Sequence, residues 1–550
     1  MKRGKIILYP LMVFLLSSKA LSQSDNFPDI ILFNGKIFTS SEENLYTEAI
    51  AIKGEKITAV GKNDEIKKLL SNDTKIIDLE GRTVIPGIND AHIHRPYLLI
   101  PVWFNMKLDN PSITDILDSL KRGTREYPAG TWLSTDFPAS LIDDENFNRY
   151  TLDKIAPEHP VWLRNFTGHA ILLNSAAINA LDVDKKYKNI NDKSVGRFPD
   201  GNLNGKFFEY SNWNLNQQLS ADTPDSVIIK AINNFSYGVL KYGITSVQTM
   251  PVIFDEFQVA NLIAENDLPI RWRVMRVSPK MLNEDEINST KGFRKNKVTL
   301  SGLKYIIDGT PIERFGALSN PYSDKPDWYG FINFNENKLK RIFEISKNTG
   351  EQLLFHCIGD SSLKLVLRTM KNFADTEFWQ DKRVRIEHGD GLSDDLIELA
   401  KELGVIILPN PSHFAFPEIF MQRFGEERYN KYYLQKSLLD AGLNLAFGSD
   451  GPINPYLNIM FAVTHPTHPK EAITVEQAVI LYTKQTAYAE FMENEKGQLK
   501  EGMLADLAVL SQDIFTIPFD TLPKTESVFT MVGGQVVYDA GVLKSSAVKE

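Results

Sequence analysis

Short runs rich in isoleucine and valine alternate with helical patterns from about residue 225 onward. Val227–Leu240, for example, has apolar residues at helical spacing, and the strand pattern Ile244–Met250 follows it. Such alternation predicts a parallel sheet with helices on its faces, because its strands are buried on both sides. The predicted strands span 84–94, 244–250, 270–277, 302–308, 352–358, 384–388, 405–408 and 443–449. Eight strands of this kind indicate an α/β fold with a (β/α)8 TIM-like barrel.

Both ends of the chain carry a different pattern, in which short apolar runs alternate with turns. Asn34-Gly35 separates two such runs near the N-terminus, and Gly533-Gly534 divides the run Ser527–Tyr538 near the other end. These patterns are typical of antiparallel strands joined by tight turns. Two β segments at opposite ends of the chain can share one small β-sandwich beside the barrel.

The two patterns together predict the domain boundaries. We expect residues 23–85 and 498–550 to form the β-sandwich domain, and residues 86–497 to form the barrel domain. The stretch 97–240 lies between the first two barrel strands and is too long for a single connection. It predicts a subdomain inserted after the first barrel strand.

The first residues have the organisation of a secretory signal peptide. A basic start at residues 2–5 precedes the apolar run Ile6–Leu16, and small residues follow up to Ser22, which suits cleavage before Gln23. The apolar run is shorter than the roughly 20 residues that span a bilayer, which disfavours an uncleaved anchor. With residues 1–22 removed, we expect an exported protein, periplasmic or secreted, that has no membrane span.

Composition restricts the partners and the type of metal site. The chain has 61 Lys+Arg and 70 Asp+Glu, a formal charge of −9 without basic clusters, so no nucleic-acid partner is expected. Its single cysteine, Cys357, excludes an intramolecular disulfide and a cysteine-based zinc cluster. Metal ligands would have to come from the nine histidines and the carboxylates. The sequence leaves homo-oligomerisation open.

Potential metal ligands lie at the ends of several predicted strands. His92 and His94 end the first strand, and alternate residues of a strand point to the same face. His356, His388 and Asp450 end three other apolar runs. Barrel enzymes place their catalytic groups at the carboxyl ends of strands, so these residues are expected to converge on one site. Surface histidines or satisfied core histidines are the alternative, but they would not all be expected at strand ends.

Lys304 lies in the apolar fourth strand, where a bare ammonium is costly to bury. A salt bridge to Asp308, or a side chain that extends its ammonium to the surface, would explain it. Carbamylation by CO2 is the other explanation, because it converts the ammonium into an anionic group that can bridge two cations. The residues alone leave these explanations open.

In combination, these segments resemble the amidohydrolase superfamily of metal-dependent hydrolases. Within it they are similar to amidohydrolase family 3, the group that includes YtcJ-like enzymes and N-substituted formamide deformylase. The resemblance covers nearly all of the mature chain. The segments that carry it are Val84–His94, Gly168–His169, Asn174–Ala177, Asp200–Glu209, Lys304–Gly309, His356–Asp360, Arg385–His388, Gly448–Asp450 and Gly502–Leu507.

The resemblance implies two divalent metal ions, with zinc as the expected metal. The implied ligands are His92 and His94 for one ion, His356 and His388 for the other, Asp450, and a CO2-derived carbamate on Lys304 that bridges the two ions. Zinc lowers the pKa of bound water to about 7 and so supplies hydroxide at neutral pH. Asp450 is the expected catalytic residue, which accepts a proton and passes it to the leaving amine.

The implied activity is hydrolysis of a non-peptide C–N bond in a small-molecule amide, formamide or cyclic amide by metal-activated hydroxide. The alternatives are a mononuclear amidohydrolase and a non-catalytic exported binding protein on the same scaffold. All six implied ligand positions hold competent residues, which argues against a binding protein. A serine mechanism based on Ser361-Ser-Leu-Lys364 lacks the Lys-Thr-Gly element that it requires.

Four further residues are expected to bind substrate. The resemblance implies His169, Asp308 lies in a matching motif, and Arg95 and His465 lie where the chain departs from the family pattern around the ligands. His413 is assigned no role.

Overall fold

The computed structural model describes residues 27–97, 100–105, 110–187, 192–277 and 284–547. The signal peptide expected at residues 1–22 lies outside these ranges. Within them, no helix combines the length and apolar character that a bilayer-spanning helix needs.

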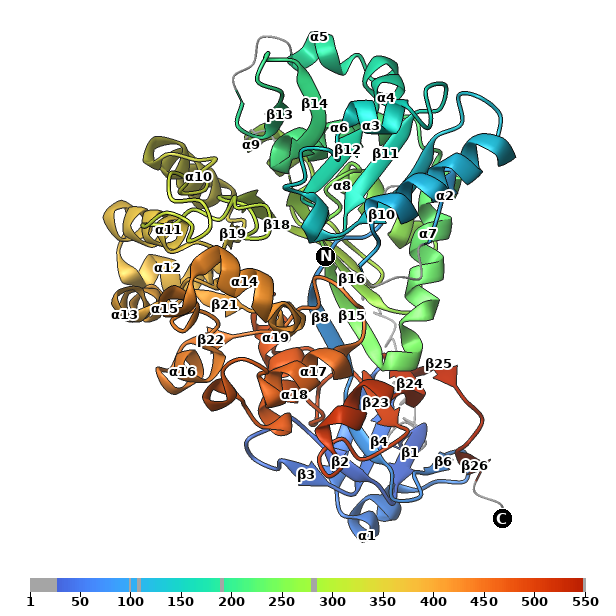
Figure 1. Ribbon diagram of the computed structural model, residues 1–550. Helices are drawn as coiled ribbons and strands as arrows, with labels where there is room; N and C mark the ends of the chain where they lie inside the picture. Colours follow the sequence, from blue (N-terminus) through green and yellow to red (C-terminus); the bar gives the residue numbers. More distant parts are fainter. Residues whose placement is uncertain (1–26, 98–99, 106–109, 188–191, 278–283, 548–550) are drawn as a thin grey trace, which may run out of the picture.

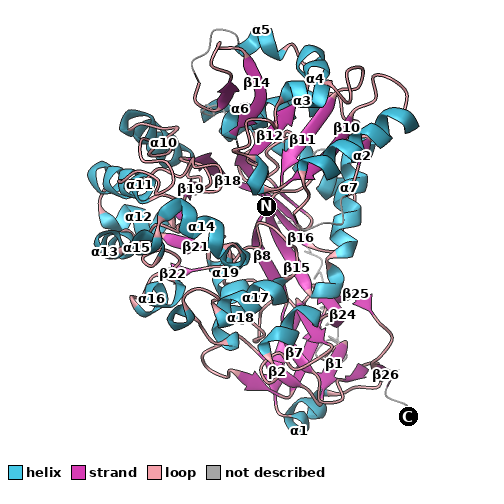
Figure 2. Ribbon diagram, viewed as in Figure 1, coloured by secondary structure: helices cyan, strands magenta, loops and turns pink. Residues whose placement is uncertain are grey.

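A curled sheet of parallel strands forms the centre of the molecule (Figures 1 and 2). Eight strands of the described chain follow one another in it, in sequence order: β8 (Ile88–Ile93), β15 (Ile244–Thr249), β16 (Arg271–Val277), β18 (Val298–Ile306), β19 (Leu353–Cys357), β20 (Arg385–His388), β21 (Ile406–Leu408) and β22 (Asn444–Leu445). The amide of Ala91 donates to the carbonyl of Phe447 (3.3 Å), and the amide of Asp450 donates to the carbonyl of His92 (2.9 Å). The segment that follows β22 therefore lies against β8, and the carboxyl ends of the strands face a common space.

Helices cover the outer face of this sheet. Among them are α8 (Glu256–Glu265), α10 (Glu336–Thr349), α11 (Asp360–Phe373), α13 (Asp394–Glu402), α17 (Pro455–Thr464) and α18 (Val475–Tyr482). In α10, Leu339, Ile342 and Phe343 are fully buried in the main core, because their spacing places them on one helix face. The Asn335 side chain accepts from the Lys338 amide and caps the start of this helix.

The predicted strand 84–94 is two strands in the structure. β7 (Thr83–Pro86) belongs to a separate sheet, and β8 starts only at Ile88. Gly87 lies between them, where a Cβ atom would be 2.1 Å from the Thr245 hydroxyl oxygen. Only glycine allows the chain to pass this close to β15 as it crosses from one sheet to the other.

Two sheets at the bottom of Figure 1 combine strands from both ends of the chain. One contains β1 (Ile30–Phe33), β4 (Ala49–Lys53), β5 (Lys56–Gly61), β6 (Lys75–Asp78) and β26 (Lys544–Ala547). The other contains β2 (Lys36–Phe38), β3 (Tyr46–Thr47), β7, β23 (Leu507–Leu510), β24 (Ser527–Val532) and β25 (Gln535–Asp539). Leu32 and Val84 from one end of the chain share a core cluster with Leu507 and Met531 from the other. The Arg271 guanidinium of β16 binds Asp506 (2.7 Å) and so links these sheets to the barrel strands.

A third sheet lies between β8 and β15 in the sequence, at the top of Figure 1. Its strands are β9 (Val102–Trp103), β10 (Leu133–Phe137), β11 (Val161–Asn165), β12 (Ala170–Leu173), β13 (Val195–Arg197) and β14 (Leu203–Phe208). The helix α2 (Ile113–Glu126) packs on β10, and α6 (Glu209–Ser220) directly follows β14. The end of β14 and the start of α6 deliver Glu209 to the space above the central sheet, beside His169.

Candidate metal centre

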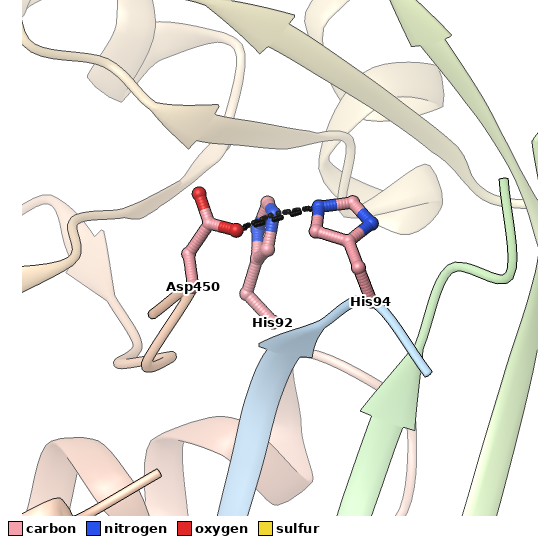
Figure 3. A group of neighbouring side chains, drawn as sticks. All are labelled: His92, His94 and Asp450. Atoms are coloured by element: carbon pink, nitrogen blue, oxygen red, sulfur yellow. Dashed lines mark hydrogen bonds and ion pairs between the residues drawn. The ribbon is translucent and has the colours of Figure 1, made fainter. Parts of the chain in front are cut away.

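His92, His94 and Asp450 converge at the carboxyl end of the sheet (Figure 3). The Asp450 Oδ1 atom is 3.4 Å from Nε2 of His94 and 3.6 Å from Nε2 of His92. The two Nε2 atoms are 3.3 Å apart. Although burial alone would raise the pKa of Asp450, the neighbouring histidines hold it well below its usual range. An ionised carboxylate thus faces two imidazole nitrogens across a gap that suits a cation.

His356 and His388 lie beside this group on β19 and β20. Nε2 of His388 is 3.8 Å from the other oxygen of Asp450, and the rings of His356 and His388 are 4.5 Å apart. Burial lowers the pKa of both histidines well below its ordinary value, so their rings are neutral and each has a lone pair to offer. Nε2 of His356 is buried and makes no hydrogen bond to any described group.

Three of these histidines are oriented through Nδ1. His92 contacts Glu387 Oε2 (2.5 Å), His94 contacts the carbonyl of Met250 (3.1 Å), and His388 contacts Asn410 (2.7 Å). These contacts leave the Nε2 atoms free for a ligand, which is the arrangement of most metal-binding histidines. Burial raises the pKa of Glu387, but Arg385, Lys304 and His92 outweigh it and hold the pKa well below its usual range.

Lys304 is 2% exposed and its ammonium extends toward the same centre. Its Nζ atom is 4.0 Å from Glu387 Oε2 and makes no hydrogen bond within the described chain. Burial lowers the pKa of Lys304 to about 8. The side chain therefore does not reach the surface, and neither salt bridge nor hydrogen bond joins it to Asp308.

Asp308 does not lie in the cavity, contrary to the prediction that it binds substrate. It is fully buried, and its carboxylate accepts four hydrogen bonds of 2.7–2.9 Å. The donors are the amides of Ala317, Ile358 and Gly359 and the hydroxyl of Ser362. Asp308 therefore organises the loops around β19.

The residues present fit a divalent metal. The Nε2 atom of His356, which makes no hydrogen bond within the described chain, the neutral imidazoles and the Asp450 carboxylate are nitrogen and oxygen donors that such ions prefer. Two sets of three donor atoms each lie within 4.8 Å of one another: His92, His94 and Asp450, and His388, His413 and Asp450.

His169 faces this centre from the inserted unit. Its Nδ1 atom is 3.1 Å from Glu209 Oε2, and its ring lies 5.4 Å from the ring of His356. Burial would lower the pKa of His169, but the buried Glu209 carboxylate outweighs it and raises the pKa to about 9. The imidazole is therefore protonated at neutral pH at the wall of the cavity that contains the ligands.

A family model described as the amidohydrolase family matches residues 75–538 of the chain. The protein belongs to this family. The resemblance inferred from the sequence motifs is thereby confirmed.

Three relatives match this amidohydrolase over nearly its whole length. The Protein LONG AFTER FAR-RED 3 of Arabidopsis thaliana is 27% identical, and the match covers 93% of this chain and 91% of the relative. The putative amidohydrolase YtcJ of Bacillus subtilis strain 168 is 26% identical, with 92% of this chain and 99% of the relative covered. The N-substituted formamide deformylase of Arthrobacter pascens is 23% identical, with 93% of this chain and 98% of the relative covered. A solved structure of an uncharacterized metal-dependent hydrolase from Pyrococcus horikoshii OT3 has a TM-score of 0.70 at 22% identity, covering 89% of this chain and 99% of its own.

These matches identify the curled parallel sheet of the amidohydrolase as a TIM-like barrel. Family membership supports a hydrolase that uses a divalent metal and acts on a small molecule. The coarse fold class and enzyme class predicted from the sequence are confirmed at this level.

Two further residues predicted to bind substrate do not line the cavity of the amidohydrolase. His465 is fully buried, and its ring stacks on Phe414 at 4.2 Å, so it packs a loop. The Arg95 guanidinium lies over the rings of Tyr97 (3.8 Å) and Phe235 (4.9 Å), and Arg95 is not among the residues that line the cavity. Both predictions relied on departures from the family pattern in loops expected to contact substrate, and a position in such a loop does not determine side-chain direction.

Sequence reasoning missed three residues of this centre. Glu387 contacts Nδ1 of His92, Asn410 contacts Nδ1 of His388, and Nε2 of His413 lies 3.8 Å from Asp450. For Glu387 a signal was available, because a charged pair at i and i+2 inside an apolar strand needs a buried partner. No comparable pattern marks Asn410 or His413.

We predict that Glu387→Gln weakens the binding of Zn²⁺ by about 10–100-fold, because the neutral amide orients His92 less strongly than the carboxylate does. The control is Glu398→Gln, which changes an exposed carboxylate on α13. Competition against a chromogenic chelator measures both affinities. Equal affinities in the two variants would contradict the role given to Glu387.

Proposed function

We propose that this amidohydrolase hydrolyses a non-peptide C–N bond of a small-molecule amide, formamide or cyclic amide. The observation that carries the proposal is the convergence of four histidines, and of a lysine that makes no hydrogen bond within the described chain, around one ionised carboxylate, Asp450. The likeness to an N-substituted formamide deformylase supports a C–N bond as the target. We propose two divalent ions as cofactors, with zinc as the metal, held by His92, His94, His356, His388, Asp450 and a carbamate on Lys304.

The metal, when bound, would activate water at neutral pH and polarise the substrate carbonyl. Asp450 is ionised and can take up a proton, which it then gives to the leaving amine. His169 can donate a hydrogen bond to the substrate carbonyl from its second ring nitrogen, because the Glu209 contact keeps the imidazole protonated. The buried contact between Glu387 and His92 holds the ligand set in place.

A mononuclear amidohydrolase is the second candidate. The donors of His92, His94 and Asp450 lie within 3.6 Å of one another, whereas His388 and His413 are each 3.8 Å from Asp450. The first set is thus the more compact one for a single ion.

We also propose that the protein is exported. The basic, apolar and small-residue regions within residues 1–22 support a cleaved signal. Metal ligation without cysteine thiolates suits an oxidising compartment.

We predict that Asp450→Asn lowers kcat/KM by about 10²–10⁴-fold, because the amide cannot accept the proton. Asp440→Asn, an exposed position at the end of α16 (Gln435–Asp440), is the matched control and should retain activity. The assay is hydrolysis of N-formyl amines, N-acyl amino acids and cyclic ureides, together with metal analysis. Full activity in Asp450→Asn, or wild-type protein without stoichiometric metal, would contradict the proposal.

We predict that metal-depleted protein is reactivated by Zn²⁺ only with CO2 present, and faster at higher pH. Carbamylation requires the neutral amine, and a Lys304 pKa of about 8 means that this form increases as the pH rises. At constant dissolved CO2, the neutral fraction therefore increases about tenfold for each pH unit below this pKa. ¹³C NMR with labelled bicarbonate identifies the carbamate, and Lys304→Ala is the control that should lack it. Equal reactivation without CO2 would exclude this role of Lys304.

A further inference from the structure

The cavity that contains the metal ligands is also lined by one arginine, Arg164, which comes from β11 of the inserted unit. Asp450 is the only acidic residue of the described chain that lines this cavity. A second cavity, of about 490 Å³, adjoins it and is lined by Asp390 and Asp450, but by no lysine or arginine of the described chain. Because an arginine side chain stays protonated in proteins, Arg164 gives the first cavity a permanent positive charge that the second lacks.

The Arg164 guanidinium is held on one edge and on its face. Arg164 is paired in register with Asp136 of the neighbouring strand β10, and its Nε and Nη2 donate to the two carboxylate oxygens (2.9 and 3.3 Å). The guanidinium also lies over the ring of Trp103, with Cζ 4.7 Å from the ring centroid. The side chain is 30% exposed, and Nη1 makes no hydrogen bond within the part of the chain that the structure describes. A guanidinium has five N–H donors, so those on Nη1 remain for a ligand.

A second guanidinium, that of Arg95, lies near the first. Cζ of Arg95 is 3.8 Å and Cζ of Arg164 is 5.5 Å from the centroid of the Tyr97 ring. Arg95 forms no ion pair with a carboxylate of the described chain, and its Nε atom is buried without a hydrogen bond there. The two guanidinium groups and the Asp136 carboxylate leave one net positive charge around Tyr97. A site of this charge attracts a monoanion, most strongly where solvent is partly excluded.

A purely structural role for the pair of Arg164 and Asp136 is the alternative. An ion pair at a partly exposed position contributes little to stability, because solvent screens it. Such a role requires neither a place on the cavity wall nor a second guanidinium nearby. The position of Arg164 on the wall of the cavity that contains the metal ligands therefore favours a role in binding.

We propose that Arg164 binds a carboxylate of the substrate, so that the enzyme selects small amides or formamides that carry this group. The proposal rests on the proposed function, because the scissile bond would lie at the metal centre while the carboxylate contacts Arg164. Guanidinium N–H donors form short charge-assisted hydrogen bonds to a carboxylate. Arg95, which does not line the cavity, adds to the attraction through its charge. Arg164 is a specificity-determining residue and takes no part in the bond cleavage.

Binding of stable ketones to the zinc-loaded protein tests the proposal without turnover. Titration calorimetry would compare 4-oxopentanoate, which carries the carboxylate, with 5-methylhexan-2-one, in which an isopropyl group replaces it. We expect 4-oxopentanoate to bind about 10–100-fold more tightly. Arg164→Met should bring the ratio of the two affinities close to one. Arg164→Lys, which keeps the charge but loses the planar edge, should keep part of the ratio.

Asp136→Asn separates binding from a structural role. This variant frees Arg164 from a competing carboxylate, so it should bind 4-oxopentanoate about 2–5-fold more tightly than the wild type and leave the binding of 5-methylhexan-2-one unchanged. A purely structural pair predicts no gain in affinity for the anion. The control is Arg125→Met, at an exposed position on α2 of the inserted unit, which should leave the ratio unchanged.

Equal binding of the two ketones to the wild type, or binding of neither, would overturn the proposal. A ratio that survives in Arg164→Met would also overturn it, because the metal would then hold the carboxylate. If Arg164→Met does not fold, Asp136→Asn decides, and unchanged or weaker binding of the anion in that variant overturns the proposal. Kinetics with N-formylglycine and N-isobutylformamide should show the same preference in kcat/KM. If the ketones discriminate but neither formamide is cleaved, the carboxylate site stands and the proposed reaction fails.

Discussion

The buried ion pair between Arg385 and Glu387 is the interaction on which the candidate metal centre depends. Both side chains are fully buried, and the guanidinium binds both oxygens of Glu387 (2.8 and 3.1 Å). Arg385 also donates to the carbonyl of Ala91 and to Gln248, so one guanidinium joins β20 to β8 and β15. Glu387 in turn holds His92 and lies 4.0 Å from Lys304. Loss of either partner would leave an uncompensated charge inside the barrel, which is why this geometry is strongly specified.

Most of the fold could be predicted, because each barrel strand is an apolar run of the right length between a helix and a turn. The boundary at Gly87 could not, since the apolar pattern continues through it and the close approach to Thr245 is a contact between distant parts of the chain. The last strand is shorter than predicted for a related reason. After Leu445 the chain leaves regular pairing but keeps hydrogen bonds to β8, which a pattern of side chains does not reveal.

The residues of the candidate site could likewise be predicted only in part. Residues at strand ends, such as His356 and His388, could be placed because the geometry of a parallel sheet brings those ends together. Residues on loops could not, because their side-chain direction is decided by packing: His465 turns onto Phe414 and away from the cavity. Asp390, a loop residue two positions after His388, shows the opposite case, because it lines the cavity although no sequence pattern marks it.

The central claim is that the strand ends of this amidohydrolase hold two divalent ions bridged by a modified Lys304. The most direct measurement is an anomalous-scattering map of the zinc-loaded crystal, recorded on both sides of the zinc absorption edge. The account predicts two peaks, one at His92 and His94 and one at His356 and His388, with extra density on Nζ of Lys304. One peak beside an unmodified lysine would contradict the bridged centre and favour the mononuclear enzyme. The absence of any peak among these residues would contradict the metal centre itself.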